Sequence, residues 1–334
     1  MRICVFGAGA IGGHLAAKLA AAGHQVSAVA RGAQLEAIRQ NGLRLMHGDE
    51  VIRGRVAAAG RADGLGPQDV VIVATKANAL GALAAQLPAL VGRDTAVVFA
   101  QNGIPWWYAA GVNAGAHAAR PAPPGLPRLD PGGALARAVP REHIVGAVVY
   151  SANDIVEPGV ILNHTPGNNM LVVGECDDRA SGRIAGLRAA LEASGMSSPA
   201  TDDIRQAVWN KLILNLGTST LCLLAGCTVG EMRSDARLAE VAKRIAEEGR
   251  AIALAHGVDP EKAPRRPSGR HAPAAMAHKP SILHDYESGR PMEVEAQLAA
   301  PLVFARAAGV ATPALDALIP PAMYKAAAKG LYSP

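Results

Sequence analysis

The chain has 334 residues, of which 50% are hydrophobic, and a formal net charge of +5 at pH 7. This length predicts about two domains of roughly 100–200 residues each, and the apolar content is too high for a disordered protein. Because the basic residues are dispersed and aromatic residues make up only 3% of the chain, the charge indicates an anionic small-molecule ligand and argues against nucleic acid.

The first predicted element is a strand over residues 2–6, and a glycine-rich turn follows it directly. The turn has the pattern Gly-x-Gly-x-x-Gly and leads into an alanine-rich helix that extends to Ala22. This order is typical of dinucleotide-binding domains, in which the glycines permit a tight turn, a close approach to a pyrophosphate and close packing of helix on strand. The residues predicted to bind the cofactor here are Gly7, Gly9, Ala10, Ile11 and Gly12.

A second strand over residues 24–30 ends at Arg31, about 20 residues beyond the glycine turn. NAD-preferring domains usually place an acidic residue there to bind the ribose hydroxyls, whereas a guanidinium suits the additional phosphate of NADP(H). We therefore predict NADP(H) as the cofactor. The alternative is that Arg31 is an ordinary cation of a surface loop.

Strand-like and helical patterns alternate through the first half of the chain. Helices are expected to end near residues 22, 40 and 90, and further strands are expected over residues 70–74 and 96–100. This alternation predicts right-handed βαβ units. The predicted fold class is therefore an N-terminal α/β Rossmann domain with a mostly parallel, doubly wound sheet that carries helices on both faces.

A stretch rich in Gly, Pro and Ala over residues 109–140 predicts a long surface loop at the carboxyl edge of that sheet. Additional strands are expected over residues 144–150, 159–163 and 170–173. A turn at residues 157–159 is expected between the first two of them.

The periodicity changes near residue 202 to helix after helix. We place the domain boundary in the segment 197–199, where serines and a proline interrupt the pattern. The predicted domains are an NADP-binding Rossmann-like domain over residues 1–200 and an all-α substrate-binding and catalytic domain over residues 201–334.

The first helix of the second domain carries a polar stripe. Lys211, Asn215 and Ser219 are four residues apart, which places them on one face of a helix whose neighbouring positions are largely Leu and Ile. A lysine in such surroundings needs a polar destination, because burying an unpaired cation is costly. We favour a cation that faces a cavity over a solvated helix face.

The spacing of the cysteines bears on metal binding, and the apolar runs bear on the cellular compartment. The four cysteines show no CxxC spacing, so we expect small buried thiols and no metal site. These cysteines are Cys4, Cys176, Cys222 and Cys227. A strand follows Met1 almost at once and the longest apolar runs are too short to span a bilayer, so we expect a cytoplasmic protein with no membrane partner.

Several motifs follow one another along the chain. In order they are Gly7-x-Gly9-x-x-Gly12, Arg31, Lys76, Gln101-Asn102-Gly103, Trp209-x-Lys211-x-x-x-Asn215 and Ser281-x-Leu283-x-Asp285-x-Glu287-x-Gly289-Arg290-x-x-Glu293. Together they resemble the ketopantoate reductase (2-dehydropantoate 2-reductase) family nearly from end to end. The resemblance implies NADPH-dependent reduction of a 2-keto acid to a 2-hydroxy acid, in pantothenate biosynthesis if the substrate is ketopantoate. It also implies an active site between a Rossmann domain and a helical domain.

The resemblance implies that Lys211 is the general acid. The chemistry agrees, because a hydride that arrives at a ketone carbon leaves negative charge on the oxygen, which an ammonium can stabilise and protonate. Asn102 corresponds to an asparagine beside the nicotinamide and the substrate; its alternative role is a simple Asn-Gly turn with Gly103. Lys76 corresponds to a lysine near the same cleft, so Lys76 and Asn102 join the predicted cofactor-binding residues. A solvent-facing lysine at a helix start is the alternative for Lys76.

By the same resemblance Ser281 binds the substrate carboxylate, and it is also expected to be a helix N-cap. Glu293 corresponds to an acid that orients substrate and lysine; alternatively it complements the dipole of the last helix. Asn215 and Ser219 complete the predicted substrate-binding residues. The residues expected to form structural ion pairs and caps are Asp285, Glu287 and Arg290.

The chain also departs from the family pattern. At Ser219 the family often carries a second asparagine that contacts the distal hydroxyl of the substrate, and residues 294–299 replace a common acidic, aromatic and Asn-Gly pattern. The bulky run at residues 104–108 is expected to anchor the following loop, although it could also shape the pocket. Two alternatives stay open: a reductase of a different branched or bulky 2-keto acid, or a non-catalytic NADP(H)-binding sensor. The expected partner is a small-molecule 2-keto acid, and a homodimer is the assembly to test.

Overall fold

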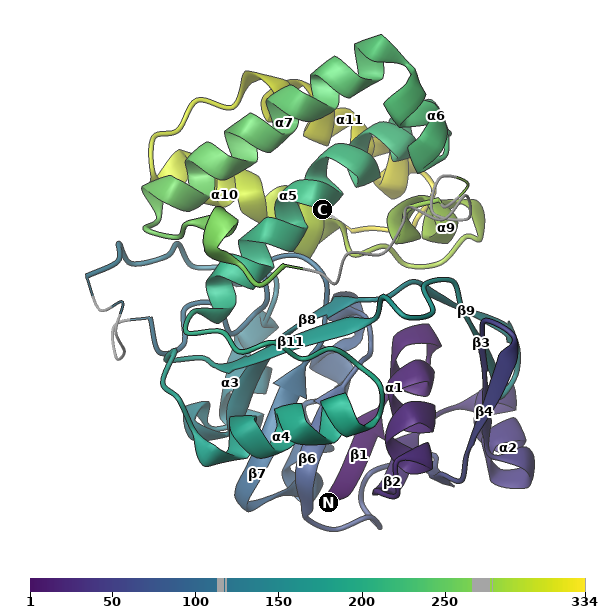
Figure 1. Cartoon of the computed structure of the whole chain (residues 1–334). Coiled ribbons are helices and arrows are strands. Elements are labelled where there is room, and N and C mark those ends of the chain that lie inside the picture. The colour runs from purple at the N-terminus through teal and green to yellow at the C-terminus, as the bar shows by residue number, and fades with distance from the viewer. Residues whose placement is uncertain (113–116, 118, 266–276, 278, 334) are drawn as a thin grey trace. The chain divides into compact units, whose positions relative to one another are not determined.

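A computed structural model of the chain describes residues 1–112, 117, 119–265, 277 and 279–333 (Figure 1). The chain forms two compact units. The first includes Met1–Gln101 and Asp130–Ile204, and the second includes Asn102–Leu129, Arg205–Ala263 and the C-terminal residues from 279. The chain therefore enters the second unit at Asn102, returns to the first, and leaves it again after Ile204.

The first unit is built on a seven-stranded sheet with the order β11-β8-β7-β6-β1-β2-β5. Its strands are β1 (Arg2–Phe6), β2 (Gln25–Val29), β5 (Ala57–Ala59), β6 (Gln68–Val73), β7 (Val91–Phe99), β8 (Ile144–Tyr150) and β11 (Met170–Glu175). All neighbours are parallel except β8 and β11, which are antiparallel. The strand order reverses direction at β1, and the predicted Rossmann-like α/β fold is confirmed.

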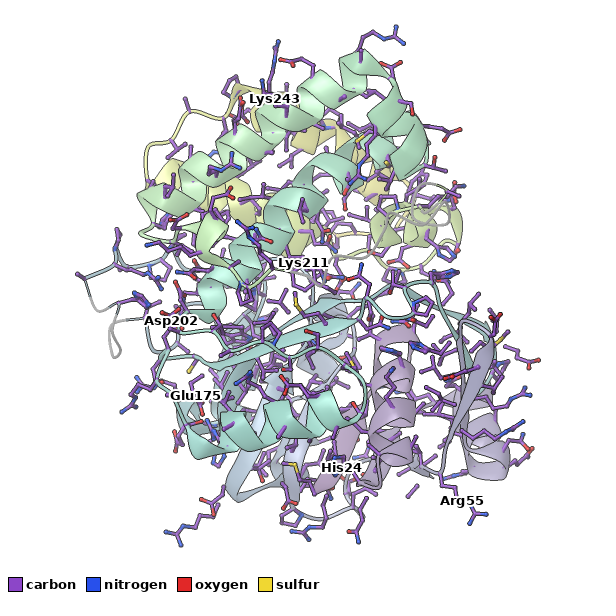
Figure 2. The ribbon with its side chains drawn as sticks, in the orientation of Figure 1. His24, Arg55, Glu175, Asp202, Lys211 and Lys243 are labelled. Atoms are coloured by element: carbon purple, nitrogen blue, oxygen red, sulfur yellow. The ribbon has the colours of Figure 1, made fainter. Side chains whose placement is uncertain are left out.

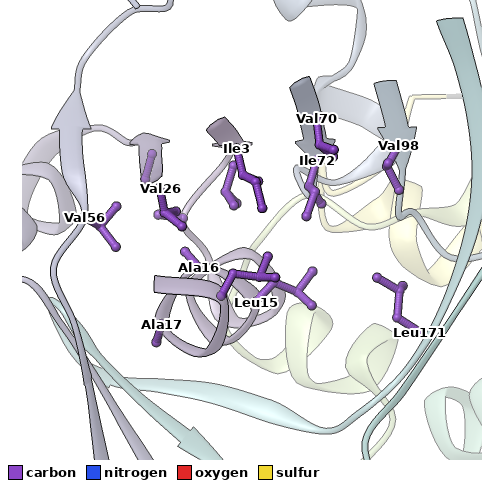
Figure 3. Close-up of a cluster of buried hydrophobic side chains, with 14 of the residues drawn as sticks. Ile3, Leu15, Ala16, Ala17, Val26, Val56, Val70, Ile72, Val98 and Leu171 are labelled. Atoms are coloured by element: carbon purple, nitrogen blue, oxygen red, sulfur yellow. The ribbon is translucent and has the colours of Figure 1, made fainter. Parts of the chain in front are cut away.

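Helices α1 (Ala10–Ala21) and α4 (Gly182–Ala193) cover one face of this sheet (Figure 1). Leu15 of α1 packs with Ile3 and Ile72 of the strands, and Leu171 belongs to the same buried cluster (Figure 3). Burial of each such side chain contributes about 1.5–3 kcal/mol. The cluster therefore fixes α1, and with it the glycine turn from which α1 begins.

A second sheet of four strands, which the sequence analysis did not predict, packs on α1. Its order is β4-β3-β10-β9, and its strands are β3 (Leu43–His47), β4 (Glu50–Gly54), β9 (Asn153–Glu157) and β10 (Val160–Asn163). The contact is close, because a Cβ added at Gly13 of α1 would lie 2.8 Å from Ile161 Cδ1. The predicted turn at residues 157–159 joins β9 to β10, and not β8 to β10. These strands are short and partly exposed, with Met46 and Val51 facing outward, so their apolar periodicity is weak.

The helix predicted to run to about residue 90 is wrong. The structure has three short 3-10 helices there, η1 (Ala77–Ala79), η2 (Gly81–Leu83) and η3 (Leu87–Leu90). Gly81 lowers helix propensity and Pro88 lacks a backbone N–H, so the segment does not form one continuous α-helix. Two further helices of this half are α2 (Gly32–Asn41) and η5 (Arg141–His143).

The stretch predicted as one long loop over residues 109–140 contains regular structure near its end. A 3-10 turn η4 (Pro131–Gly133) leads into the short helix α3 (Ala134–Ala138). The carboxylate of Asp130 accepts hydrogen bonds from the N–H groups of Leu135 at 2.8 Å and Ala136 at 3.0 Å. This capping carboxylate stabilises the start of α3, and residues 113–116 and 118 of the stretch lie outside the described residues.

In the second unit, the regular elements of the described residues from 204 onward are helices and none of them is a strand, as predicted. Its helices are α5 (Ile204–Ala225), α6 (Val229–Ser234), α7 (Ala236–Ala255), η6 (Pro260–Lys262), α9 (Ser281–Glu287), the π-helical turn η7 (Glu295–Ala299), α10 (Ala300–Ala307) and α11 (Pro313–Ala328). Among the described helices of the whole chain, none combines the length and the apolar character needed to cross a membrane.

Aromatic side chains form the core around the start of α5. Trp209 Nε1 donates to Tyr108 Oη at 2.7 Å, and Phe304 packs edge-on against both rings. The fully buried Arg205 donates to the carbonyl of Tyr108 at 2.9 Å and of Ala110 at 2.7 Å. The bulky run at residues 104–108 therefore anchors the loop that follows it, as the sequence indicated.

Candidate functional site

The glycine turn connects β1 to α1 with little room for any other residue. Gly7 has φ +97°, and its N–H donates to Val29 O at 3.0 Å. A Cβ at Gly12 would lie 2.0 Å from Gly7 O, so only glycine lets α1 pack this close to the strand. At Gly9, by contrast, an added Cβ would meet nothing within 4 Å, so the space in front of the helix start is open.

The start of α1 suits an anion. Its first turn, which begins with Ala10 and Ile11, contains no acidic residue. Unpaired N–H groups at a helix start carry positive partial charge and bind phosphate oxygens. The open space at Gly9 together with these N–H groups fits the pyrophosphate of a dinucleotide.

Two glutamines to which the sequence analysis gave no role hold the loops at this edge of the sheet. Gln34 Nε2 donates to Ala8 O in the glycine turn at 2.8 Å. Gln101 Nε2 donates to Val73 O at 2.7 Å and to Thr75 O at 3.0 Å, in the loop after β6. Both side chains bridge segments that are distant in sequence, which no local pattern reveals.

The two predicted cofactor cations lie on loops at the carboxyl ends of β2 and β6, the two strands that pair with β1. Arg31 follows β2 as the N-cap residue of α2 and is exposed. Lys76 follows β6 as the N-cap residue of η1 and is half-buried. Because β1 lies between β2 and β6 in the sheet, Arg31 and Lys76 flank the glycine turn.

Behind the turn, α1 buries two basic side chains. Burial, with Lys18 and His47 nearby, lowers the pKa of His14 to about 3, so this fully buried imidazole is neutral at physiological pH. Burial also lowers the pKa of Lys18, whose ammonium donates to the carbonyls of Ser194 and Gly195. His14 therefore adds no charge to the N-terminal end of α1.

In the second unit, the structure brings two predicted residues into direct contact. Lys211 projects from the N-terminal half of α5 (Figure 2). Its Nζ donates to Asn102 Oδ1 at 2.6 Å in a partly buried setting. This bond places the ammonium and the side-chain amide, 109 positions apart in sequence, at one point. This contact fixes the direction of one N–H group of the amine.

Asn102 is held by the turn to which it belongs. Gly103 has φ +84°, and a Cβ there would lie 2.4 Å from Ala296 O. The N–H of Ile104 donates to that same carbonyl at 2.8 Å. The expected Asn-Gly turn is present and docks on η7, while the Asn102 side chain contacts Lys211; its place beside the nicotinamide and the substrate stays a prediction.

Glu293 lies just before the helical segment that contains η7. It is only 8% exposed, and Gln297 Nε2 donates to its Oε2 at 3.3 Å. Gln297 itself is buried, and its backbone N–H donates to Glu293 O at 3.2 Å. The sequence analysis missed Gln297, although its position one helical turn after Glu293 was a usable signal.

The remaining predicted substrate residues are distributed along two helices. Asn215 is half-buried and Ser219 is buried, both on α5 beyond Lys211. Ser281 is exposed and is the first residue of α9, so the expectation that it is the N-cap is wrong: Pro280 occupies that position. Pro280 precedes the helix in a non-helical conformation, so the helix begins at Ser281 itself and not at the residue after it.

The residues expected to be structural near this segment form ion pairs. Arg290 Nε donates to Asp285 Oδ1 at 3.0 Å, and Lys279 pairs with Glu287 at 2.7 Å. Asp285 is buried, whereas Arg290 is half-exposed. These pairs brace α9 and the turn after it, as predicted.

Comparison with known proteins supports one family. Residues 3–106 match the family model "Ketopantoate reductase PanE/ApbA", and residues 203–321 match "Ketopantoate reductase PanE/ApbA C terminal". A 2-dehydropantoate 2-reductase of Mesorhizobium japonicum is 39% identical over 335 residues, covering 100% of both chains. The crystal structure of a candidate ketopantoate reductase from Ralstonia solanacearum has 33% identity and a TM-score of 0.85, covering 99% of both chains. The 2-dehydropantoate 2-reductase of Geobacter metallireducens has 26% identity and a TM-score of 0.77, covering 96% of this chain and 98% of that one. With family models matching both halves and a relative of this identity matching throughout, the chain belongs to the ketopantoate reductase family.

Proposed function

We propose that this protein reduces a 2-keto acid to the 2-hydroxy acid with NADPH, and that 2-dehydropantoate is its substrate. The observation that carries the proposal is the 2.6 Å hydrogen bond between Lys211 Nζ and Asn102 Oδ1. It gives the ammonium a defined direction beside an amide group, which is neutral and does not exchange a proton with the lysine. The names of the relatives support the choice of substrate.

The first unit supplies the cofactor site. Phosphates would lie over Gly9 against the N–H groups at the start of α1. When bound, the reduced nicotinamide supplies the hydride that the keto carbon accepts. The predicted cofactor contacts of Lys76 and Asn102 are part of this proposal, with Lys76 positioned beside the turn.

The second unit supplies the groups that handle charge on the substrate. Lys211 would stabilise the developing alkoxide and then transfer a proton from Nζ to that oxygen. Asn102 keeps the amine oriented, and the buried carboxyl group of Glu293 would orient lysine and substrate. We assign the substrate carboxylate to the exposed hydroxyl of Ser281 and the rest of the substrate to Asn215 and Ser219.

The proposal is tested by NADPH oxidation with a panel of 2-keto acids. We expect the highest kcat/KM with 2-dehydropantoate, and lower values with pyruvate and with phenylglyoxylate. The reason is that Asn215 and Ser219, in the polar stripe of α5, can form hydrogen bonds with a hydroxyl group on the substrate chain. Absorbance at 340 nm provides the rate. A higher kcat/KM with phenylglyoxylate would favour the alternative that the enzyme reduces a different, bulkier 2-keto acid. Tight cofactor binding without turnover of any acid would favour the alternative of a non-catalytic NADP(H)-binding sensor.

Arg31 is expected to determine cofactor preference. Arg31→Ala should raise the Kd of NADPH about tenfold and leave the Kd of NADH nearly unchanged, because a charge-assisted hydrogen bond to the 2′-phosphate is lost. Fluorescence titration with both nucleotides measures the two constants. Arg55→Ala, at an exposed arginine before β5 (Figure 2), is the matched control and should change neither. Equal affinities of the unaltered protein for NADPH and NADH would contradict the assignment of Arg31.

A further inference from the structure

The helix after Glu293 contains one turn in π register. The N–H of Ala300 donates to Glu295 O, five residues earlier, which is the π pattern. The next donor in that register would be residue 301, and its acceptor would be Ala296 O. Residue 301 is proline and has no N–H. Within its own helix, η7 therefore leaves the Ala296 carbonyl without the donor that the register would supply.

A segment almost two hundred residues earlier in the sequence supplies the donor instead. Ile104 N–H donates to Ala296 O at 2.8 Å, and Gly103 packs so close that a Cβ would collide with the same carbonyl. Ala296 and Ile104 are both buried, so the carbonyl needs a protein partner. In α register the N–H of Ala300 would donate to this carbonyl and compete with Ile104, so the attachment of the Asn102 turn would be weakened.

Proline at 301 also disfavours the α register sterically. In an α-helix its ring would clash with the carbonyl four residues before it, which is that of Gln297. The wider π turn relieves this clash. Local chemistry at one residue thus selects the register, and the register determines which carbonyl faces the Asn102 turn.

We infer that Pro301 is a positioning residue for catalysis: by holding η7 in π register it keeps the Ala296 carbonyl available to Ile104 and so fixes Asn102, and through it the Lys211 amine. The inference rests on the proposed function. It links the segment that carries Glu293 to the turn that carries Asn102, so Pro301 would act through Asn102. A helix irregularity that costs stability is maintained here because it supports the site.

Pro301→Ala tests this inference, because it restores an N–H and removes the ring. We expect the helix to relax toward α register, with the melting temperature unchanged or raised and kcat lowered about tenfold, since small displacements of a catalytic group are costly. Cofactor Kd should stay the same. Hydrogen exchange of a peptide covering residues 102–108 should accelerate at Ile104. A loss of stability alone does not lower kcat while the melting temperature is maintained.

Pro320→Ala in α11 is the matched control, because it makes the same chemical change at an exposed proline inside a helix of the same unit. It should leave kcat and the exchange of residues 102–108 unchanged. A Pro301→Ala variant with unchanged kcat, or with unaltered exchange at Ile104, overturns the inference. If the unaltered protein reduces no 2-keto acid, the proposed function fails, and the exchange measurement still decides whether Pro301 controls the Asn102 turn.

Discussion

Replacement of Lys211 by methionine is expected to lower kcat for keto acid reduction by about 10²–10⁴-fold, the usual contribution of a positioned proton donor. Methionine keeps an unbranched apolar stem of similar length and removes the amine that donates to Asn102 Oδ1 at 2.6 Å. Because the amine stabilises charge that forms in the transition state, kcat and kcat/KM should fall together. Steady-state NADPH oxidation measures both constants.

The control for this substitution is Lys243→Met. Lys243 is exposed on α7, where it pairs loosely with Glu247 at 3.9 Å (Figure 2). Surface ion pairs of this kind contribute little, so kcat should stay within about twofold of the unaltered enzyme. Equal cofactor Kd and melting temperature would show that Lys211→Met leaves the fold intact. Full turnover by the folded Lys211→Met protein would eliminate the proposed proton donor.

Gly103→Ala is expected to damage both stability and catalysis. The added Cβ would lie 2.4 Å from Ala296 O and 2.5 Å from its carbonyl carbon, and φ is +84°. The strained backbone and the collision with a backbone group should lower the free energy of unfolding by about 2–4 kcal/mol. Displacement of Asn102 should lower kcat by about 10²-fold in the molecules that remain folded. Chemical denaturation and active-site-normalised kinetics measure the two effects.

Gly309→Ala separates strain from collision. Gly309 has φ +64°, and a Cβ there would meet nothing within 4 Å. This variant should lose only about 1 kcal/mol of stability from its left-handed backbone and should keep the original kcat. A Gly103→Ala enzyme with the kinetics of Gly309→Ala would mean that the Asn102 turn does not position the lysine.

The nucleotide-binding half could be predicted because its signals are local. The glycine turn, the strand before it and the helix after it follow one another within about twenty residues, and each glycine has its own steric reason. The 3-10 helices after β6 and the second sheet could not be predicted in the same way. The position of the second sheet depends on packing against α1, for instance at Gly13 and Ile161, and this contact joins distant parts of the chain.

In the candidate site, too, the features that depend on local sequence could be predicted, and those that depend on contacts between distant segments could not. The four-residue spacing of Lys211, Asn215 and Ser219 is a property of one helix, so the polar stripe is visible in the sequence. The partner of the lysine is Asn102, and its support at Ala296 depends on a helix register that only the fold reveals. A proline at residue 301 is evident in the sequence, but the identity of the carbonyl that it leaves open is not.

The second sheet imposes an order on biosynthesis. Leu45 of β3 pairs with Ile161 of β10, so β3 cannot form this pairing until more than a hundred further residues have been synthesised. Until then, one edge of β3 and the surface of α1 at Gly13 lack their partners. Such long-range pairing slows folding and exposes unpaired strand edges in the nascent chain. A fragment that stops near residue 106 is therefore expected to require chaperones and to precipitate when produced alone.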